Sequence, residues 1–219
     1  YDVNEWSAEV IEMKAQGFAK NNTVEGARLR WVGQEFESNN CGKCLITDYI
    51  GKGRVVVEFY DPKYSTICHI SGLQKGNVRN PYHATVYGKG FLGVGRFNRR
   101  SEREYTLWEG MLFRCYNKKS YTTNPSYKKV NVCDEWLNFQ NFAEWCHKQE
   151  FFTGVDDKGR SYQLDKDVLI KGNKIYSPET CCFVPQEINS FLTNGKASRG
   201  KYPIGVQFEK ETGRFRALM

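Results

Sequence analysis

The spacing of apolar residues separates helical from extended segments along the chain. Trp6, Val10 and Met13 recur at helical intervals, so residues 5–20 are predicted to form an amphipathic helix. Residues 22–32 lack this spacing and are predicted to form a connection. The pattern therefore predicts one helix and one linking segment before residue 33.

Residues 30–72 alternate between short apolar runs and turns that contain glycine or asparagine. The runs at 34–37, 44–50 and 54–60 have the length and composition of strands. The sequence Gly51-Lys-Gly53 between the last two runs is typical of a hairpin turn. We expect a small antiparallel sheet here, either barrel-like or an open meander, and nothing in it indicates catalysis.

Two amphipathic helices are predicted in the second half of the chain. The first spans residues 102–116 with Ser101 as its cap, and the second begins after Asn138 as its cap. Between them we expect a basic loop at 117–129 and a short strand at 130–133. The apolar faces predicted to enter the core are Tyr105, Trp108, Met111, Leu112 and Cys115 in the first helix, and Phe139, Phe142, Trp145 and Cys146 in the second.

A net charge of +7 becomes informative when it is placed along the chain. Residues 61–130 carry 13 basic and 4 acidic side chains, Arg79 among the basic ones, whereas the rest of the chain is nearly balanced. A local excess of this kind is typical of a surface that binds nucleic acid, and a solvated face without a partner is the alternative. The candidate DNA-binding residues in this stretch are Arg96, Arg99, Arg100, Arg114, Lys118 and Lys119.

Residues 72–100 are rich in glycine and contain the string Gly88-Lys-Gly90-Phe-Leu-Gly93. A dinucleotide-binding fingerprint of this form needs a preceding buried strand, a following helix and an acidic residue about 20 positions on. A basic segment with another glycine follows instead, so we expect no dinucleotide site. Glycines interleaved with aromatic residues and arginines favour an irregular loop beside a phosphate backbone, with a plain structured surface loop as the alternative.

Eight cysteines in 219 residues are too sparse for a disulfide framework and are predicted to be reduced. Cys41 and Cys44 form a lone C-x-x-C, and no histidine stands at ligand spacing from a cysteine, so a structural zinc is left open on an incomplete ligand set. A mean hydropathy of −0.64 and the lack of a long apolar run indicate a soluble protein with no membrane partner.

Four stretches carry a resemblance to a known family: 105–117 (YTLWEGMLFRCYN), 132–142 (VCDEWLNFQNF), 164–167 (LDKD) and 176–181 (YSPETC). In order and spacing they resemble bacteriophage proteins of the HNH endonuclease type, many of them homing endonucleases. The likeness covers about residues 104–192, and the segment before it also resembles the one that precedes this region in such proteins. It implies a ββα-metal fold, in which two short strands and a helix hold one divalent cation, Mg²⁺ or Mn²⁺.

Matched residue by residue, the resemblance implies a catalytic set of Asp165, Lys166, Thr180 and Asn189. Asp165 stands at the family's metal-binding aspartate and Asn189 at its helix ligand, with Asp167 as a further metal ligand. Lys166 replaces the histidine that acts as general base, and Thr180 replaces the loop asparagine that orients it. A lysine with an ordinary pKa near about 10.4 is a poor general base, and two flanking aspartates are expected to keep it protonated.

Three outcomes are open for a site with Lys166 in place of histidine. The lysine contacts the scissile phosphate while another group deprotonates the water; or Asp165, Asp167 and Asn189 still bind a metal that lowers the pKa of water; or the site is inactive and the fold only binds DNA. A purely structural interpretation also stands, in which the aspartates are a polar strand end and Asn189 is a helix surface residue.

Residues 201–217 resemble the opening hairpin of an Apetala-type DNA-binding domain, which reads the major groove with a three-stranded sheet. Two of its three strands fit into this stretch. Arg214 and Arg216 alternate with Phe215, which places both guanidinium groups on one face, as contacts to bases or phosphates require. Residues 194–200 are predicted to form a flexible linker.

Together these expectations describe an α+β protein of four parts: a helix at 1–25, a small antiparallel β-rich domain with a basic Gly-rich loop at 26–100, an HNH-like ββα-metal domain at 101–193, and a linker with a partial Apetala-type β-hairpin at 194–219. The predicted function is that of a phage DNA-binding protein of HNH endonuclease type. It acts in the host cytoplasm and hydrolyses phosphodiesters of double-stranded DNA with a metal ion. The alternative is a catalytically inactive HNH-like protein that binds DNA or a host protein, and the oligomeric state is left open.

Overall fold

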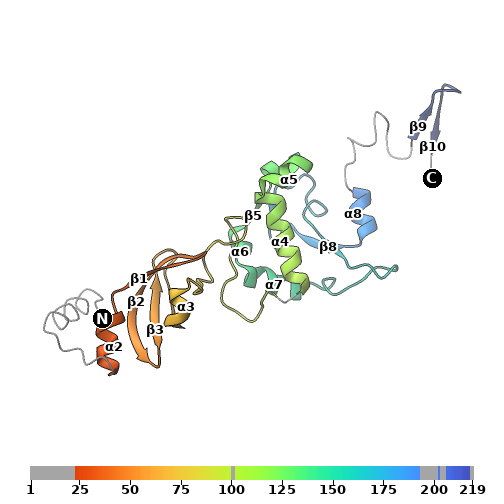
Figure 1. Cartoon of the computed structure of the whole chain (residues 1–219). Helices are drawn as coiled ribbons and strands as arrows, with labels where there is room; N and C mark the ends of the chain where they lie inside the picture. Colours follow the sequence, from red (N-terminus) through yellow and green to blue (C-terminus); the bar gives the residue numbers. More distant parts are fainter. Residues whose placement is uncertain (1–22, 100–101, 193–201, 203–205, 218–219) are drawn as a thin grey trace. The chain divides into compact units, whose positions relative to one another are not determined.

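The computed structural model describes residues 23–99, 102–192, 202 and 206–217 (Figure 1). The helix predicted at 5–20 and the linker predicted at 194–200 lie outside these residues. By its internal contacts the chain divides into a first unit, residues 1–146, and a second unit, residues 147–219. The fold is α+β, with an antiparallel sheet in the first unit and a C-terminal hairpin in the second, as the sequence predicted.

The antiparallel sheet is an open meander of four strands in the order of the chain. These are β1 (Glu35–Ser38), β2 (Gly42–Gly51), β3 (Arg54–Phe59) and β4 (Tyr64–His69). The predicted hairpin turn between β2 and β3 is confirmed, because Gly51, Lys52 and Gly53 all have positive φ angles, 94°, 53° and 71°. Two of these three positions are glycines, the residue for which a positive φ carries no steric penalty.

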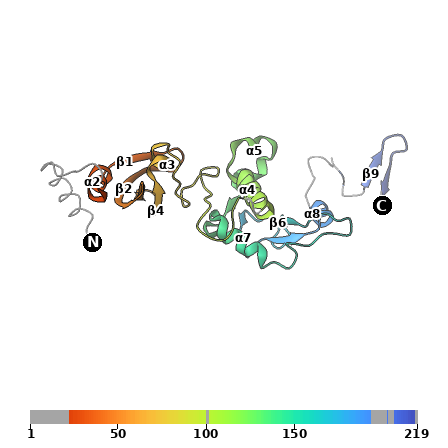
Figure 2. The same ribbon diagram turned by 60° about the horizontal axis from the view of Figure 1, so that its bottom comes forward.

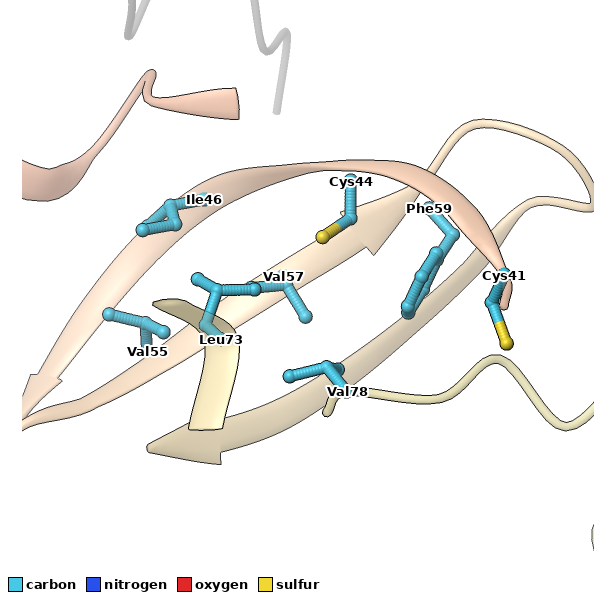
Figure 3. Close-up of a cluster of buried hydrophobic side chains, with 8 residues drawn as sticks. All are labelled: Cys41, Cys44, Ile46, Val55, Val57, Phe59, Leu73 and Val78. Atoms are coloured by element: carbon cyan, nitrogen blue, oxygen red, sulfur yellow. The ribbon is translucent and has the colours of Figure 1, made fainter. Parts of the chain in front are cut away.

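One face of this sheet forms a small apolar core (Figure 3). Val55, Val57 and Phe59 alternate along β3 and are fully buried, as expected for a strand with one face in a core. The core is completed by Cys41, Cys44, Ile46, Leu73 and Val78. The helix α3 (Ile70–Gln74) follows β4 directly and supplies Leu73.

Residues 22–32 were predicted as a connection, and this prediction was wrong, because the helix α2 spans Val24–Trp31. The Oγ1 atom of Thr23 accepts a hydrogen bond from the N–H of Gly26 at 3.0 Å and so caps the helix. Only Gly26 and Leu29 are buried. The helix has no apolar stripe for a periodicity test to detect, and its start is set by the cap.

The remainder of the first unit is mostly helical. The predicted helix at 102–116 is confirmed as α4 (Glu102–Tyr116), and the second predicted helix is confirmed as α7 (Phe139–His147). Asn138 caps α7, because its Oδ1 accepts the N–H of Gln140 at 3.0 Å. Trp108 joins the two regions, since its Nε1 donates to the carbonyl of Trp136 at 2.7 Å. The side chains buried to 0 % exposure here are Trp108, Met111, Leu112, Trp136, Phe139, Phe142, Ala143 and Cys146.

The basic loop predicted at 117–129 is instead a pair of short helices. They are α5 (Lys118–Thr123) and the 3₁₀ helix η1 (Pro125–Lys129). The predicted short strand follows as β5 (Asn131–Val132), and after it comes the helix α6 (Asp134–Leu137). Asn117 caps α5, because its Oδ1 accepts the N–H of Lys119 at 2.9 Å. A proline begins η1, a position where its missing N–H has no cost. The cap at Asn117 and the proline at the start of η1, and not apolar spacing, mark these two helices.

The second unit contains a strand pair followed by a helix. The strand β6 (Gln163–Asp165) pairs antiparallel with β8 (Cys182–Val184). Between them in the chain comes β7 (Ile175–Tyr176). The helix α8 (Gln186–Leu192) contacts β6 (Figure 2). The predicted final helix is thus confirmed. The predicted C-terminal hairpin is also confirmed, as β9 (Val206–Glu209) and β10 (Arg214–Ala217). Within the described ranges, no helix is long and apolar enough to cross a membrane.

Candidate functional site

The Gly-rich loop, defined here as residues 88–99, is held in place by one buried amide. Gln140 on α7 is 8 % exposed. Its Nε2 donates to the carbonyls of Leu92 and Phe97 at 3.1 and 2.8 Å, and its Oε1 accepts the N–H of Phe97 at 3.0 Å. Further support comes from Phe91, which exchanges backbone hydrogen bonds with Leu137 and Phe139. The loop has no regular secondary structure, yet its backbone has a fixed place.

The glycines of this loop serve packing. A Cβ atom at Gly90 would collide with the side chains of Leu112 and Trp108 on α4. At Gly93 it would collide with Asn138, and at Gly95 with Gln140. The string that resembles a dinucleotide fingerprint therefore lets the loop approach two helices, and no strand–helix unit surrounds it among the described residues.

The arginines of the Gly-rich loop project from this fixed backbone. The Arg96 side chain is 70 % exposed, lies 4.7 Å above the Phe97 ring centre and is 3.9 Å from Glu144, itself exposed. The Arg99 guanidinium lies 5.3 Å from the ring centre of Tyr105. Exposed ion pairs are worth little, so both arginines stay available to a phosphate group. Arg100 lies outside the described residues.

The other predicted DNA-binding residues of the first unit lie at the far end of α4. Arg114 is in its last turn and half-buried, while Lys118 and Lys119 are exposed in the first turn of α5. A helix of 15 residues is about 22 Å long. The structure therefore gathers the basic residues into two groups, one at each end of α4, and not into one cluster.

In the second unit, the carboxylate of Asp165 closes a turn. Asp165 is the last residue of β6, and its Oδ1 accepts the N–H groups of Asp167 and Val168 at 2.6 and 2.8 Å. Its Oδ2 makes no hydrogen bond to the described residues. The predicted metal ligand is half-buried at the edge of the strand pair, with one oxygen already engaged by the backbone.

Lys166 is buried and fully engaged inside the protein. Its side chain is 7 % exposed, and its Nζ donates to Asp167 Oδ2 at 2.6 Å and to the carbonyl of Asn173 at 2.9 Å. The side chain of Asn173 in turn donates to the carbonyls of Lys166 and Ile175 at 2.9 and 2.5 Å. These bonds close the loop 166–174. With 7 % of the Lys166 side chain exposed and its ammonium group bonded to Asp167 and Asn173, little of it is open to a scissile phosphate.

Thr180 and Asn189 are likewise bonded within the second unit. The Oγ1 of Thr180 donates to the carbonyl of Ile175 at 2.8 Å and accepts the N–H of Ser177 at 3.2 Å, which fixes the turn after β7. The Nδ2 of Asn189 on α8 donates to Gln163 Oε1 at 2.7 Å and so connects the helix to β6. Thr180 holds a loop, as the family's asparagine is implied to do, but no imidazole is there to be oriented.

The three predicted metal ligands do not form a ready site for Mg²⁺ or Mn²⁺. One oxygen of Asp165 closes a turn, one oxygen of Asp167 is paired with Lys166, and the Nδ2 of Asn189 holds that side chain at Gln163. In the part of the chain that the structure describes, no three His, Cys, Asp or Glu side chains are grouped so that they would hold a metal. We therefore derive no chemical step through a cation, and its binding stays a prediction.

The C-x-x-C pair lies in the core of the sheet. Cys41 and Cys44 are 2 % and 0 % exposed. Burial raises the pKa of the Cys44 thiol to about 11. The two cysteines pack as small apolar side chains in this core, and none of the eight cysteines of the chain is in a disulfide.

The C-terminal hairpin presents its arginines as the alternation predicted. Arg214 and Arg216 are exposed on β10, and Arg216 lies 3.2 Å from Glu209 on β9. Phe215 points to the opposite face, where its ring lies 5.2 Å from those of Phe208 and Tyr202. A small aromatic cluster therefore holds the two strands together and leaves the basic face open.

The sequence did not reveal the roles of two buried amides, and it gave Arg79 as basic without naming it as a binding residue. Gln140 and Asn173 each hold a loop through several backbone contacts, and Arg79 projects from a fixed segment at the start of the Gly-rich region. Arg79 was recognisable as part of the basic stretch, but nothing local distinguished the two amides. Comparison with models of protein families, with curated proteins and with solved structures finds no match for this chain.

Proposed function

We propose that the protein binds the phosphate backbone of DNA through the Gly-rich loop and the start of α5, and that its ββα unit is a binding scaffold and not an HNH hydrolytic centre. The observation that carries this is the contrast at Gln140: its amide makes three hydrogen bonds to the loop backbone, while Arg96 and Arg99 stay exposed. Cationic groups on a fixed backbone bind phosphates with little loss of conformational entropy.

The distribution of charge supports a duplex as the ligand. The groups at Arg96 and Arg99 and at Lys118 and Lys119 stand at opposite ends of α4, about 22 Å apart. Successive phosphates of one DNA strand are about 3.4 Å apart along the axis, so the two groups span about six base-pair steps. Two separated anchors of this kind position a duplex without reading its sequence.

The state of Lys166 supports a scaffold over a nuclease. A general base must lie within hydrogen-bond reach of the water that it deprotonates. Lys166 is instead buried against Asp167 and the Asn173 carbonyl. The likeness to phage HNH proteins is thereby proposed as a likeness of scaffold. The host cytoplasm is the proposed compartment, which the free thiols favour.

The salt dependence of DNA affinity tests the binding proposal. Fluorescence anisotropy with a labelled duplex of about 25 base pairs gives the affinity between about 50 and 300 mM salt. We expect log K to fall linearly with log salt, and the slope to fall by about 1 for each of Lys118→Ala, Lys119→Ala and Arg99→Ala. Lys75→Ala, an exposed lysine near α3, is the matched control and should leave the slope unchanged. An affinity that does not depend on salt would refute the proposal.

Metal-dependent hydrolysis is the second candidate function, and one observation favours it. Asp165 Oδ2 makes no hydrogen bond to the described residues, so one carboxylate oxygen at the end of β6 is open to a cation. Plasmid nicking with Mg²⁺ and with Mn²⁺ tests this, with Asp165→Ala and Asn189→Ala beside the wild type. Metal-dependent nicking that disappears in Asp165→Ala would establish the enzyme and overturn the scaffold assignment.

A further inference from the structure

A groove beside the Gly-rich loop shares Arg99 with the duplex contacts proposed above and adds Arg79, which they do not use. It consists of two adjoining hollows of about 490 and 550 Å³, which share Arg79, Leu92, Gly93 and Arg99 in their walls. We propose that this groove holds one nucleotide of an unpaired DNA strand, with its phosphate between Arg79 and Arg99 and its base in the second hollow. This inference rests on the proposed function, because it assumes that DNA is the ligand.

Arg79 projects from a rigid segment. Its neighbours Val78 and Asn80 are 7 % and 2 % exposed, while Arg79 itself is exposed. The Oγ of Ser38 donates to the carbonyl of Val78 at 2.6 Å, and the Nδ2 of Asn80 donates to the carbonyl of Pro62 at 2.6 Å. The backbone on both sides is therefore fixed. Arg79 makes no ion pair with the described residues, so its charge is not neutralised by the protein itself.

Arg99 approaches the same space from the end of the Gly-rich loop. Its guanidinium lies against the Tyr105 ring at 5.3 Å, a contact that orients the planar group. The first hollow is lined by Arg79, Arg99, Asn98 and Gln140 among others, and by no acidic residue. Two guanidinium groups beside one hollow suit a phosphate, because each presents several N–H donors to its oxygens.

The second hollow has the chemistry of a base site. Tyr87 and Tyr105 supply aromatic surface, and Asn40, Asn80 and Thr85 supply polar groups. Glu109 also lines it, and burial together with this nearby carboxylate raises the pKa of Tyr87. A carboxylate disfavours a phosphate at this end and accepts from a base amino group. The polarity of the groove thus orients a nucleotide.

The size of the groove favours an unpaired strand over a duplex. Hollows of this volume fall in the range typical of small-ligand sites, about 300 to 1,000 Å³. The bases of a duplex are stacked inside it and cannot enter a hollow from the backbone side, whereas an unpaired strand offers base and phosphate together. An unpaired nucleotide is therefore the part of DNA that matches the groove.

Fluorescence anisotropy with two probes tests this inference on the full chain: a labelled single-stranded octanucleotide of mixed sequence, and a labelled duplex. We expect Arg79→Ala to weaken binding of the single strand about tenfold, as the loss of one charged hydrogen-bond donor predicts, and to change duplex affinity less than about twofold. Arg54→Ala removes an exposed arginine of β3 that does not line the groove, and it should change neither affinity.

The outcomes separate this inference from the proposed function. Equal weakening of both probes by Arg79→Ala, or no effect on the single strand, would overturn the groove assignment while salt-dependent duplex binding stands. Failure of the wild type to bind either probe would overturn both. If Arg79→Ala unfolds at the same temperature as the wild type, its loss of binding is not a loss of fold. Arg79→Lys should recover part of the affinity for the single strand, because it restores the charge.

Discussion

The Gly-rich loop of the first unit and the loop 166–174 of the second are both held by a buried polar side chain, but they differ in what becomes of their charges. In the first, the holding group is the neutral amide of Gln140, and the arginines of the loop stay exposed. In the second, the holding group is itself a charge, Lys166, and it is paired with Asp167.

The same contrast extends to the surroundings of each loop. In the second unit Lys158 lies 2.5 Å from Glu187, and Arg160 lies 2.7 Å from Asp156 and 3.2 Å from Glu187. In the first unit Lys118 and Lys119 make no ion pair with the described residues. A count of charges along the chain does not distinguish these cases. What matters for binding DNA is which charges the protein leaves unneutralised at its surface.

The largest expected effect is that of Gln140→Leu, which removes the amide and keeps the volume. The carbonyls of Leu92 and Phe97 and the N–H of Phe97 would lose their partner. Unpaired buried backbone groups cost about 1 to 3 kcal/mol each, so we expect a loss of about 3 to 4 kcal/mol in the free energy of unfolding. Urea unfolding followed by tryptophan fluorescence measures it.

Asn141→Ala is the matched control, because Asn141 is the next residue on α7 and is exposed. Its loss should cost no more than about 0.5 kcal/mol. If Gln140→Leu costs as little as this control, the Gly-rich loop is not held by the amide. The comparison of the two loops would then be wrong for the Gly-rich loop.

The second effect is that of Lys166→Met, expected at about 2 to 3 kcal/mol, because the Asp167 carboxylate and the Asn173 carbonyl would lose the ammonium group. All five tryptophans precede residue 147, so hydrogen exchange at residues 163–176 is the suitable measurement. Lys171→Met, an exposed position of the same loop, should leave exchange unchanged. Unchanged exchange in Lys166→Met together with a loss of metal-dependent nicking would assign Lys166 to chemistry.

A smaller effect is expected from Thr180→Val, which keeps the shape and removes one hydroxyl. The hydroxyl bonds to the carbonyl of Ile175 and to the N–H of Ser177, so its loss should cost about 1 to 2 kcal/mol. Faster hydrogen exchange at residues 175–181 would report it, with the exposed Thr153→Val as control. A Thr180→Val protein as stable as the wild type would show that the turn after β7 is held by other contacts.

The smallest effect is a pH dependence of the second unit. Lys158 and then Arg160 lower the pKa of Glu187, and Arg160 lowers the pKa of Asp156. A carboxyl group with a lowered pKa in the folded protein stabilises it above its unfolded pKa, about 3.9 to 4.3, and this contribution is lost as the pH falls through the folded value. We expect the protection of amides near α8, corrected for the pH dependence of intrinsic exchange, to fall below about pH 4, and less so in Glu187→Gln. An equal fall in that variant would place the acid sensitivity elsewhere.

The amphipathic helices and the hairpin turn are the parts of the fold that the sequence predicted well. The apolar faces of α4 and α7 and the hairpin turn at Gly51 and Gly53 follow from spacing and turn chemistry, whereas the final helix α8 was expected from the family resemblance. The helices α2 and α5 were missed because they are short and polar, and their capping residues, Thr23 and Asn117, act over three residues or fewer. The spacing of apolar residues does not reveal such caps.

The candidate site was predictable only in part. The sequence located the basic stretch and the residues Asp165, Lys166, Thr180 and Asn189, and it predicted that flanking aspartates would keep Lys166 protonated. It did not predict that the Lys166 side chain is buried, that Asn189 bonds to Gln163, or that Gln140 is the buried support of the Gly-rich loop. Each of these contacts except the pair with Asp167 joins residues 7 or more positions apart.

The sequence alone therefore determined where the amphipathic helices and the Gly51–Gly53 turn form and where positive charge accumulates, because these depend on neighbours within a few residues. The tertiary structure decided which charges are available. Lys166 and Arg99 are both cations beside irregular segments, yet one is enclosed by an aspartate and a carbonyl and the other lies exposed over a tyrosine ring. Desolvation and pairing set that difference, and both depend on chain segments that come together only when the protein folds.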